Sequence, residues 1–308
     1  MKRHLIIGTR QSKLALWQAN YIADELRKCY PDCTVELVKI VTSGDRILDV
    51  PLAKIGGKGL FTKEIEQDML DKKIDLAVHS LKDMPTELPD GLTLAAITKR
   101  AHPGDAFVSN KYSSLAALPA GAVIGTSSLR RRAQLLRARP DLNIVDLRGN
   151  LDTRLAKLDR GEVDAIVLAV AGLVRLGWGD RVTEILSPED CLPAVGQGAL
   201  AIEARANDEE TLAMLSVLND AETRTAVTAE RAFLGVLGGG CQVPVGVHAV
   251  MEADGATVVL EAIIASLDGK RIVRGQEQAP AQSAAELGVK LANRLLAEGG
   301  APILQEIM

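Results

Sequence analysis

Short apolar runs alternate with amphipathic segments through the first two thirds of the chain, and this alternation constrains the fold more than any other feature. Residues 5–7 form an apolar run typical of a strand, residues 12–29 repeat apolar side chains at helical spacing, and residues 35–40 alternate as a strand does. Residues 60–71 predict a further helix and residues 74–78 a further strand. Strands that alternate with helices predict an α/β fold with a mainly parallel sheet.

Two breaks divide this pattern. The first is a Pro-Gly linker at 100–104, and the second is a turn at 187–190 followed by Pro193. They suggest a chain that leaves its first lobe and returns to it, which is the layout of a binding protein with two lobes and hinge crossings. The predicted domains are a discontinuous first α/β lobe at 1–99 and 196–218, a second α/β lobe at 100–195, and a small α+β domain at 219–308.

Composition restricts the partners that this chain can have. Its 308 residues exceed the usual single domain, and 47% of them are hydrophobic, which is enough for several cores. Aromatic residues make up only 3%, which argues against a protein that stacks single-stranded nucleic acid on aromatic rings. A formal net charge of −4 argues against a broad basic surface. Any site for anions must therefore come from local clusters of arginine and lysine.

The cysteines and histidines do not form a pattern typical of disulfides or metal sites. Cys29, Cys33, Cys191 and Cys241 are too scattered for a disulfide framework, and the four histidines are dispersed. We expect exposed or half-buried thiols at Cys29 and Cys33. The first apolar run is too short for a signal peptide, and no stretch approaches the roughly 20 apolar residues of a membrane span. We therefore expect a soluble, cytoplasmic protein, without membrane or nucleic-acid partners, and a monomer.

One cysteine stands in an unusual setting. Three glycines, at 238–240, precede Cys241, and Gln-Val-Pro follows it. Glycine lets another group approach the main chain closely, so the loop could present the thiol to a bulky partner, for a covalent link or for nucleophilic work. The alternative is a free cysteine packed in a tight turn as a small apolar side chain.

Arginines recur where a strand gives way to a helix. The segments 8–12, 125–132 and 148–154 each place small or hydroxyl residues before a helix and arginines beside it. A single arginine there is usually a solvated surface group. Repetition at the same structural position favours a polyanion site, since guanidinium groups bind carboxylates and phosphates in pairs of hydrogen bonds and helix N-termini attract anions. Ser12 is expected to cap the first helix.

Two further segments suggest chemistry. Residues 54–61 form a basic, glycine-rich loop without the spacing of a phosphate-binding P-loop; it suggests a mobile lid that carries Lys54 and Lys58, or only an exposed connection. Asp83 follows an apolar strand, where α/β proteins place functional groups. Its carboxylate could move protons or stabilise a developing cation, or it could only cap a turn.

Taken together, these segments resemble the porphobilinogen deaminase family, also called hydroxymethylbilane synthases. The resemblance spans nearly the whole chain, in order and at matching intervals. It rests on eight segments: 9–12, 41–45, 54–61, 77–83, 125–131, 147–150, 192–198 and 239–244.

The resemblance implies a fold and an activity. It implies two α/β lobes like those of periplasmic anion-binding proteins, with hinge crossings, and a small α+β C-terminal domain. It implies a dipyrromethane cofactor attached to Cys241 through a thioether. The implied enzyme is a transferase of tetrapyrrole biosynthesis that joins four porphobilinogen molecules head to tail, releases ammonia at each addition, and frees hydroxymethylbilane by hydrolysis.

The resemblance also assigns roles to residues. Each substrate unit carries two carboxylates, so a growing chain needs many cations around it. Asp83 is the implied catalytic residue, and no metal is implied. The implied cofactor-binding residues are Cys241, Lys82, Asp83, Ser128, Arg130, Arg131 and Arg148. The implied substrate-binding residues are Arg10, Ser12, Thr126, Ser127, Arg148 and Arg154, and the implied active-site loop carries Lys54, Lys58 and Phe61.

Some residues depart from the family pattern, and two other functions would explain part of the sequence. Arg132 extends the arginine pair beyond what the pattern requires, and Cys191 lies outside it and is expected to be an incidental thiol open to oxidation. A non-catalytic, two-lobed anion-binding protein would explain the crossings and arginines but not the Gly-Gly-Gly-Cys segment. A cysteine hydrolase built on Cys241 would need a histidine partner, which no motif supplies.

Overall fold

The computed structural model describes residues 2–46, 59–238 and 243–307. Lys54, Lys58 and Cys241 lie outside the described residues. The described chain divides into two compact units, one made of 2–46, 59–101 and 199–224, the other of 102–198, 225–238 and 243–307.

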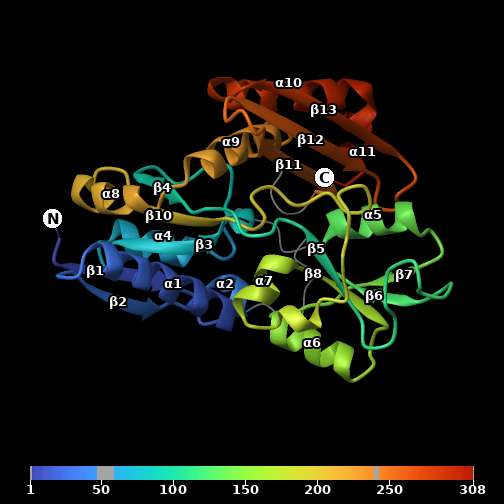
Figure 1. The fold of residues 1–308 in the computed structure, drawn as a ribbon, viewed down its shortest axis with the longest axis horizontal. Coiled ribbons are helices and arrows are strands. Elements are labelled where there is room, and N and C mark those ends of the chain that lie inside the picture. Colours follow the sequence, from blue (N-terminus) through green and yellow to red (C-terminus); the bar gives the residue numbers. More distant parts are fainter. Residues whose placement is uncertain (1, 47–58, 239–242, 308) are drawn as a thin grey trace. The chain divides into compact units, whose positions relative to one another are not determined.

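The first unit is built on a five-stranded sheet (Figure 1). Its strands are β1 (His4–Thr9), β2 (Thr34–Lys39), β3 (Leu76–Ser80), β4 (Leu92–Ile97) and β10 (Leu200–Arg205), in the order β2-β1-β3-β10-β4. β1 runs parallel to β2 and β3, whereas β10 runs antiparallel to both β3 and β4. Because β10 enters this sheet after the chain has passed through the second unit, the predicted return to the first lobe is correct.

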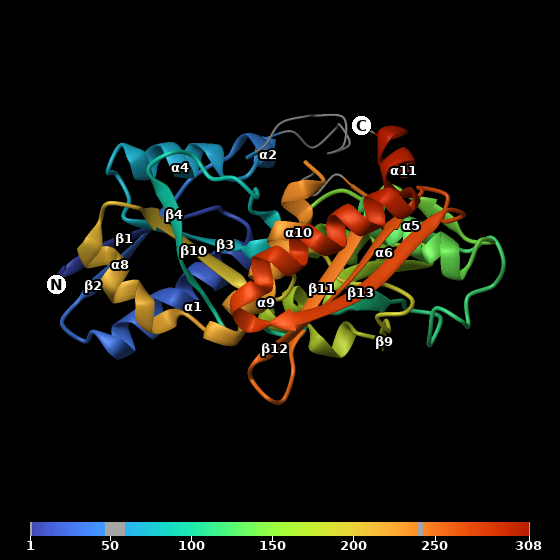
Figure 2. The same cartoon turned by 90° about the horizontal axis from the view of Figure 1, so that it is seen from above.

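Helices cover both faces of this sheet. α1 (Lys13–Cys29) and α8 (Glu209–Leu215) pack on one face, while α4 (Lys63–Leu70) packs on the other (Figure 2). Alternation along β3 explains the arrangement, because Leu76 and Val78 join the core under α1 whereas Ala77 joins the core under α4. A single helical turn, α2 (Ser43–Arg46), and two 3-10 turns, η1 (Leu81–Asp83) and η3 (Ser216–Leu218), complete the described unit.

The second unit contains a sheet of the same design. Its strands are β5 (Asp105–Val108), β6 (Val123–Gly125), β7 (Asn143–Val145), β8 (Ala165–Ala169) and β9 (Glu184–Ile185), in the order β7-β6-β8-β5-β9. β6 is parallel to β7 and β8, and β5 is antiparallel to β8 and β9. The helices of this lobe are α5 (Leu129–Ala138), α6 (Leu151–Asp159) and α7 (Val170–Arg175), with the 3-10 turn η2 (Gly179–Arg181).

Both sheets of the lobes are mainly parallel, as predicted, and each contains one antiparallel strand. In both sheets this strand, β10 or β5, is the one that arrives from the other unit, so it is not joined to its neighbour by a strand–helix–strand connection. β5 and β9 were not predicted at all. They are four and two residues long.

The C-terminal part of the second unit is the predicted α+β layer. α9 (Ala221–Val236) begins in the first unit and continues into the second, and is followed by an antiparallel sheet of β11 (Val245–Met251), β12 (Thr257–Ala265) and β13 (Ile272–Pro280). The 3-10 turn η4 (Ala281–Ser283), α10 (Ala284–Leu295), a π turn η5 (Leu296–Gly300) and α11 (Ala301–Gln305) close the chain. A Cβ at Gly288 of α10 would lie 2.2 Å from the carbonyl oxygen of Ala229, so glycine permits the close contact of α9 and α10.

The predicted fold class is confirmed: two α/β lobes, between which the chain crosses, and a small α+β C-terminal domain. The residue boundaries of the three domains stay a prediction. Cys29 is exposed, as expected, but Cys33 is buried in the core under α1, because it faces inward just before β2. Among the described residues, no helix is both long and apolar enough to cross a lipid bilayer.

Candidate functional site

The predicted catalytic aspartate follows directly on a strand of the first unit. β3 ends and the 3-10 turn η1 continues from it to Asp83. The backbone N–H of Leu81 donates to the carbonyl of Ala199 at 3.0 Å, which ties the turn to the segment leading into β10. Lys82 is half-buried and Asp83 is exposed. The sheet therefore presents the Asp83 carboxylate to solvent at a fixed point.

Arg10 lies just after β1 and is held by two neighbours in the same unit. Its Nε donates to the two carboxylate oxygens of Asp45 at 3.1 and 3.2 Å, an Nη also bonds that carboxylate, and the guanidinium lies 4.2 Å from the ring centre of Phe61. Burial tends to raise the pKa of Asp45, but hydrogen bonds from Arg10 and Thr42 outweigh it and hold that pKa below its usual value. Sequence reasoning missed Asp45 as the partner of Arg10, although the residue stands in one of the matched segments.

A buried acidic cluster lies on the α4 face of the first sheet. Nε2 of His79, on β3, lies 3.1 Å from Oε2 of Glu203, on β10, and Glu66 of α4 is buried beside them. One oxygen each of Glu203 and Glu66 is buried without a hydrogen-bond partner among the described residues. Burial, together with the negative charge of Glu203, raises the pKa of Glu66. The sequence does not predict this cluster, because His79 and Glu203 each lie in a mostly apolar strand.

In the second unit, hydroxyl groups organise the start of α5. Ser128 is the N-cap, and its Oγ accepts a hydrogen bond from the backbone N–H of Arg131 at 3.4 Å. Oγ1 of Thr126 accepts from the N–H of Ser128 at 3.2 Å, and Oγ of Ser127 accepts from the N–H of Leu147 at 3.0 Å. Ser12 caps α1 in the first unit in the same way, as predicted. A hydroxyl that accepts a hydrogen bond can still donate its proton, so these contacts are compatible with ligand binding.

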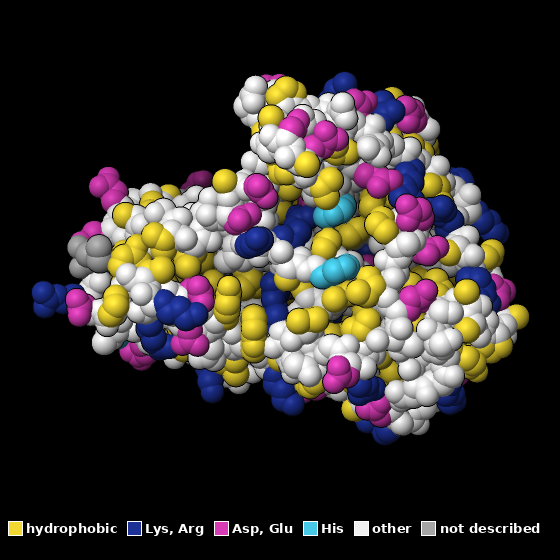
Figure 3. Space-filling model, viewed as in Figure 1, with side chains coloured by type: hydrophobic (Ala, Val, Ile, Leu, Met, Phe, Trp, Pro, Cys, Tyr) yellow, Lys and Arg dark blue, Asp and Glu magenta, His cyan; other side chains and the backbone are white. Residues whose placement is uncertain are grey.

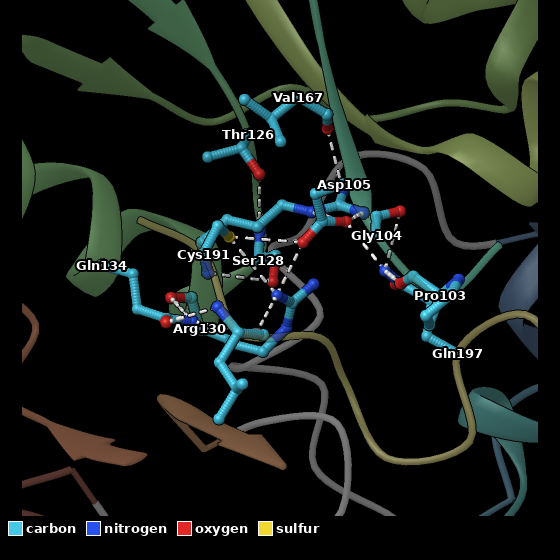
Figure 4. Close-up of polar contacts among 12 residues, drawn as sticks. Pro103, Gly104, Asp105, Thr126, Ser128, Arg130, Gln134, Val167, Cys191 and Gln197 are labelled. Carbon is cyan, nitrogen blue, oxygen red and sulfur yellow. Dashed lines mark hydrogen bonds and ion pairs between the residues drawn. The ribbon is translucent and has the colours of Figure 1, made fainter. Parts of the chain in front are cut away.

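The first turn of α5 carries the two arginines that the resemblance assigns to the cofactor, and both are buried. Figure 4 shows the polar contacts around Arg130 and Asp105. Arg130 Nη1 donates to Oδ2 of Asp105 at 2.6 Å and to the carbonyl of Leu192 at 2.7 Å. Arg131 donates to Oδ1 of Asp105 through Nε at 3.1 Å and Nη2 at 2.6 Å, and to the carbonyl of Val167 at 2.8 Å. Two guanidinium groups therefore share one internal carboxylate.

This arrangement distinguishes the two arginines from solvated surface groups, because both are buried and paired inside the unit. Burial tends to raise the pKa of Asp105, but the two cations outweigh it and hold that pKa far below its usual value. The set of Asp105, Arg130 and Arg131 consequently carries a net charge of about +1 in a buried position, since arginine does not lose its proton in proteins. An uncompensated buried charge is costly, so the set favours an additional anion.

Cys191 and Gln197 complete the surroundings of Asp105. The Cys191 thiol lies 3.3 Å from Oδ2, and Nε2 of Gln197 donates to Oδ1 at 3.0 Å. The expectation that Cys191 is an incidental thiol stays a prediction, but its burial and the Asp105 charge raise its pKa to about 12, which disfavours the oxidation considered for it. Sequence reasoning missed Asp105, whose signal was a charged residue at the start of a short apolar run.

Arg148 and Arg154 stand beside the turn that leads into α6. Gly149 has φ of +114°, and a Cβ there would lie 2.7 Å from the side chain of Thr153, so the turn requires glycine. Nε of Arg154 donates to the carbonyl of Gly149 at 2.8 Å, and both arginine side chains are half-buried. Arg132 is half-buried as well, but its Nε has no hydrogen-bond partner among the described residues.

α9, which precedes the glycine–cysteine segment, is fixed by a buried acid. Glu230 accepts hydrogen bonds from the N–H of Gly196 at 2.6 Å and from the N–H of Ala249 at 2.8 Å. This carboxylate joins α9 both to β11 and to the segment by which the chain leaves the second lobe. Cys241 itself, like Lys54 and Lys58, falls outside the described residues, whereas Phe61 is described and contacts Arg10.

The charge of the molecule fits a local rather than a global anion site. On the face shown in Figure 3, Lys and Arg side chains are interspersed with Asp and Glu side chains. Within 2–46, 59–238 and 243–307, no group of three or more His, Cys, Asp or Glu side chains is placed to hold a metal ion. The buried arginine pair is thus a local excess of positive charge within a chain of net charge −4.

Comparison with known proteins identifies the family. Residues 5–213 match the family model described as porphobilinogen deaminase, dipyromethane cofactor binding domain, and residues 224–297 match the porphobilinogen deaminase C-terminal domain. The chain belongs to the porphobilinogen deaminase family. Porphobilinogen deaminase of Desulforudis audaxviator is 56% identical over 307 residues, covering 100% of this chain and 99% of the relative. The Trichlorobacter lovleyi enzyme is 54% identical over 305 residues, covering 99% and 97%.

Membership of the porphobilinogen deaminase family confirms the predicted resemblance and the enzymatic interpretation, and the non-catalytic alternative is not supported. Among solved structures, the methionine-binding protein MetQ aligns with a TM-score of 0.46 at 16% identity, over 70% of this chain and 89% of its own. The periplasmic aliphatic sulphonate binding protein SsuA from Escherichia coli aligns with a TM-score of 0.41 at 16% identity, over 76% of this chain and 70% of its own.

Proposed function

We propose that this chain catalyses the reaction of its family: four porphobilinogen molecules are joined head to tail, ammonia leaves at each addition, and hydroxymethylbilane is released. The full-length match to porphobilinogen deaminases supports the activity. The observation that carries the proposal for the site is the buried pair of Arg130 and Arg131 around a single carboxylate, Asp105.

The residues of the second unit fit a polycarboxylate cofactor. Dipyrromethane, when bound, supplies the primer to which substrate units are added. Its acidic side chains are the additional anions that the net positive set at α5 favours, because a charge-assisted hydrogen bond to a buried guanidinium is among the strong ones. Ser128 and Arg131 sit in the first turn of α5, where the helix N-terminus also favours an anion. We assign Lys82, Ser128, Arg130, Arg131 and Arg148 to the cofactor.

Cys241 is the proposed point of attachment. A thioether is a stable link, and the glycines before Cys241 leave room for a pyrrole beside the main chain. Glu230 supports this role indirectly, since its two backbone hydrogen bonds fix the helix that precedes the segment.

Asp83 is the proposed catalytic residue. Porphobilinogen develops positive charge at its methylene carbon as its amino group departs as ammonia, and a carboxylate within reach stabilises that charge. After the new carbon–carbon bond forms, a proton must leave the attacking pyrrole α-carbon, and the same carboxylate can accept it. Its exposed position after β3 is suited to both tasks.

The substrate carboxylates are assigned to residues in both units. The proposed set is Arg10, Ser12, Thr126, Ser127, Arg148 and Arg154, with Lys54, Lys58 and Phe61 in the active-site loop. Arg10 is held by Asp45 and Phe61, so its guanidinium is already oriented before a substrate arrives.

Three further points belong to the proposal. The domains are a first lobe at 1–99 and 196–218, a second lobe at 100–195 and a third domain at 219–308. The protein works as a monomer, and it works in the cytoplasm. Sedimentation of the purified enzyme checks the monomer, since a mass of twice the chain would contradict it.

Intact-mass measurement tests the attachment. The wild-type protein is expected to carry an adduct of two pyrrole units, and Cys241→Ser is expected to lack it. Cys29→Ser, at an exposed cysteine of the first unit, is the matched control and should keep the adduct. An unchanged adduct on Cys241→Ser would rule out the thioether.

A further inference from the structure

The two segments by which the chain enters and leaves the second lobe are bonded to each other. Nε2 of Gln197, on the outgoing segment, donates to the carbonyl of Pro103 at 2.7 Å, on the incoming segment. The same nitrogen lies 3.4 Å from the carbonyl of Gly104 and 3.0 Å from Oδ1 of Asp105. Gln197 and Asp105 are almost completely buried, with exposed fractions of 1% and 0%.

The acceptor of this contact is also the carboxylate that holds the arginine pair. Oδ1 of Asp105 accepts from Gln197 and from Nε and Nη2 of Arg131, while Oδ2 accepts from Arg130 (Figure 4). The Gln197 amide and the Arg131 guanidinium therefore compete for one oxygen atom. A displacement of the amide changes the charge that Asp105 presents to the arginine.

Burial makes this link effective. In a low-dielectric interior, hydrogen bonds polarise one another, and a partner lost from a buried carboxylate is not replaced by water. Any rearrangement of the two units must be accommodated where the chain passes between them, and Pro103 and Gln197 stand next to those passages. Gln197 and Arg131 both bond the carboxylate of Asp105, so that carboxylate links the Gln197 amide to the arginine pair.

We propose that Gln197 is a positioning residue that couples the two interlobe segments to the anion-binding arginines through Asp105. As the bound oligopyrrole lengthens, movement at the interlobe segments shifts the Gln197 amide, and the shift changes how firmly Arg130 and Arg131 hold a carboxylate. This inference rests on the proposed role of those two arginines in binding the cofactor.

A purely structural role for Gln197 is the alternative, and the chain offers a matched control. Gln134 of α5 is also a glutamine with an exposed fraction of 1%. It accepts from the N–H of Leu192 at 2.8 Å and donates to the carbonyl of Leu192 at 3.1 Å, so it too holds the outgoing segment. Its described contacts do not include Asp105 or the incoming segment.

The experiment compares the holoenzymes Gln197→Met and Gln134→Met. For each variant we measure the thermal midpoint and the KM and kcat for porphobilinogen. Intact mass during turnover gives the populations of enzyme carrying one, two or three added units. Both variants are expected to lose a similar amount of thermal stability. Gln197→Met is expected to redistribute the intermediates and to slow the affected addition by about five- to tenfold, the equivalent of roughly one hydrogen bond. Gln134→Met should keep the wild-type distribution.

A second variant guards against loss of folding. Gln197→Asn keeps the amide but shortens the side chain, and it should give a smaller redistribution of the same intermediates. Wild-type intermediate distributions in both Gln197 variants, or the same change in Gln134→Met, would overturn the proposal. The proposed role of the arginines in cofactor binding is tested separately with Arg131→Met. If this variant keeps the adduct, full activity and the wild-type gain in stability on cofactor loading, that role is wrong whatever the Gln197 variants show.

Discussion

The two lobes of this enzyme share one sheet design but bury opposite kinds of charge. In each sheet the strand that arrives from the other unit stands fourth in order and carries a buried acid, Glu203 on β10 and Asp105 on β5. In the first lobe that acid meets a histidine and a second glutamate, His79 and Glu66. In the second lobe it meets two arginines.

The two lobes differ in how a buried surplus of charge can be balanced. In the first lobe the surplus of acid involves a group that can take up a proton, and burial raises the pKa of that group, Glu66. Arginine has no such neutral form near physiological pH, so the surplus of cation in the second lobe is best relieved by an anion from outside. This contrast supports the proposal that the second lobe binds carboxylates, while Asp83 of the first lobe acts on the reacting atoms.

The largest expected effect is on turnover, and it concerns Asp83, the exposed acid of the first lobe. Asp83→Asn should leave the fold and the adduct intact but lower kcat by about 10²–10⁴, the usual contribution of a positioned proton-transfer group. Asp90→Asn, at another exposed aspartate of the same unit, is the control and should keep wild-type turnover. Turnover by Asp83→Asn at the wild-type rate would remove this residue from the mechanism.

The next effect tests the buried acids against each other. Asp105→Asn leaves two buried guanidinium groups without their carboxylate and should cost about 3–5 kcal/mol in the free energy of unfolding. Because the pKa of Asp105 is held below its usual value, its stabilisation is present above that value and is lost as the pH falls below about 4. The difference from wild type, measured by denaturant unfolding, should therefore shrink in acid.

Glu66→Gln should have the opposite sign. A carboxyl whose folded-state pKa is raised destabilises the fold once the pH exceeds its unfolded-state value, because the unfolded state ionises more readily. The glutamine variant should be more stable than wild type at neutral pH, by less than the Asp105 effect, and the gain should vanish as the pH falls below about 4. A variant less stable than wild type at pH 7 would mean that Glu66 is ionised and paired.

The smallest effect concerns the helix caps that the lobes have in common. Ser12→Ala and Ser128→Ala each remove an N-cap and should each cost about 1 kcal/mol of stability. The lobes should then differ in one respect, since only Ser128→Ala is expected to weaken the stability gained on cofactor loading. Equal effects of the two variants on that gain would contradict the assignment of the cofactor to α5.

Much of the fold could be predicted from the sequence, but the pairing of the buried charged side chains could not. Strand and helix positions in the first lobe follow from hydrophobic period: the helix predicted at 12–29 is α1, and the strand predicted at 35–40 is β2. Partnership across the sheet does not follow from local pattern. Asp105 lies 25 and 26 residues from its two arginines, and His79 lies 124 residues from Glu203. The predicted arginines were therefore found, while the carboxylates that orient them were not.

The direction in which a charged side chain points was also beyond the sequence. A helix start with three arginines is compatible with an open anion site or with an interior ion pair. Asp105 begins β5, a strand that was not predicted, and its contact with Arg130 of α5 depends on the tertiary fold rather than on local sequence.

The central claim is that cofactor carboxylates balance the surplus positive charge of the second lobe, and cofactor-dependent stability tests it most directly. The free energy of unfolding is measured for wild type and Arg131→Met, each as adduct-bearing protein and as adduct-free protein made in cells unable to synthesise porphobilinogen. The stability gained on loading should be smaller in Arg131→Met by about 1.5–3 kcal/mol, the worth of a hydrogen bond to a charged group. An equal gain in the two proteins would contradict the account.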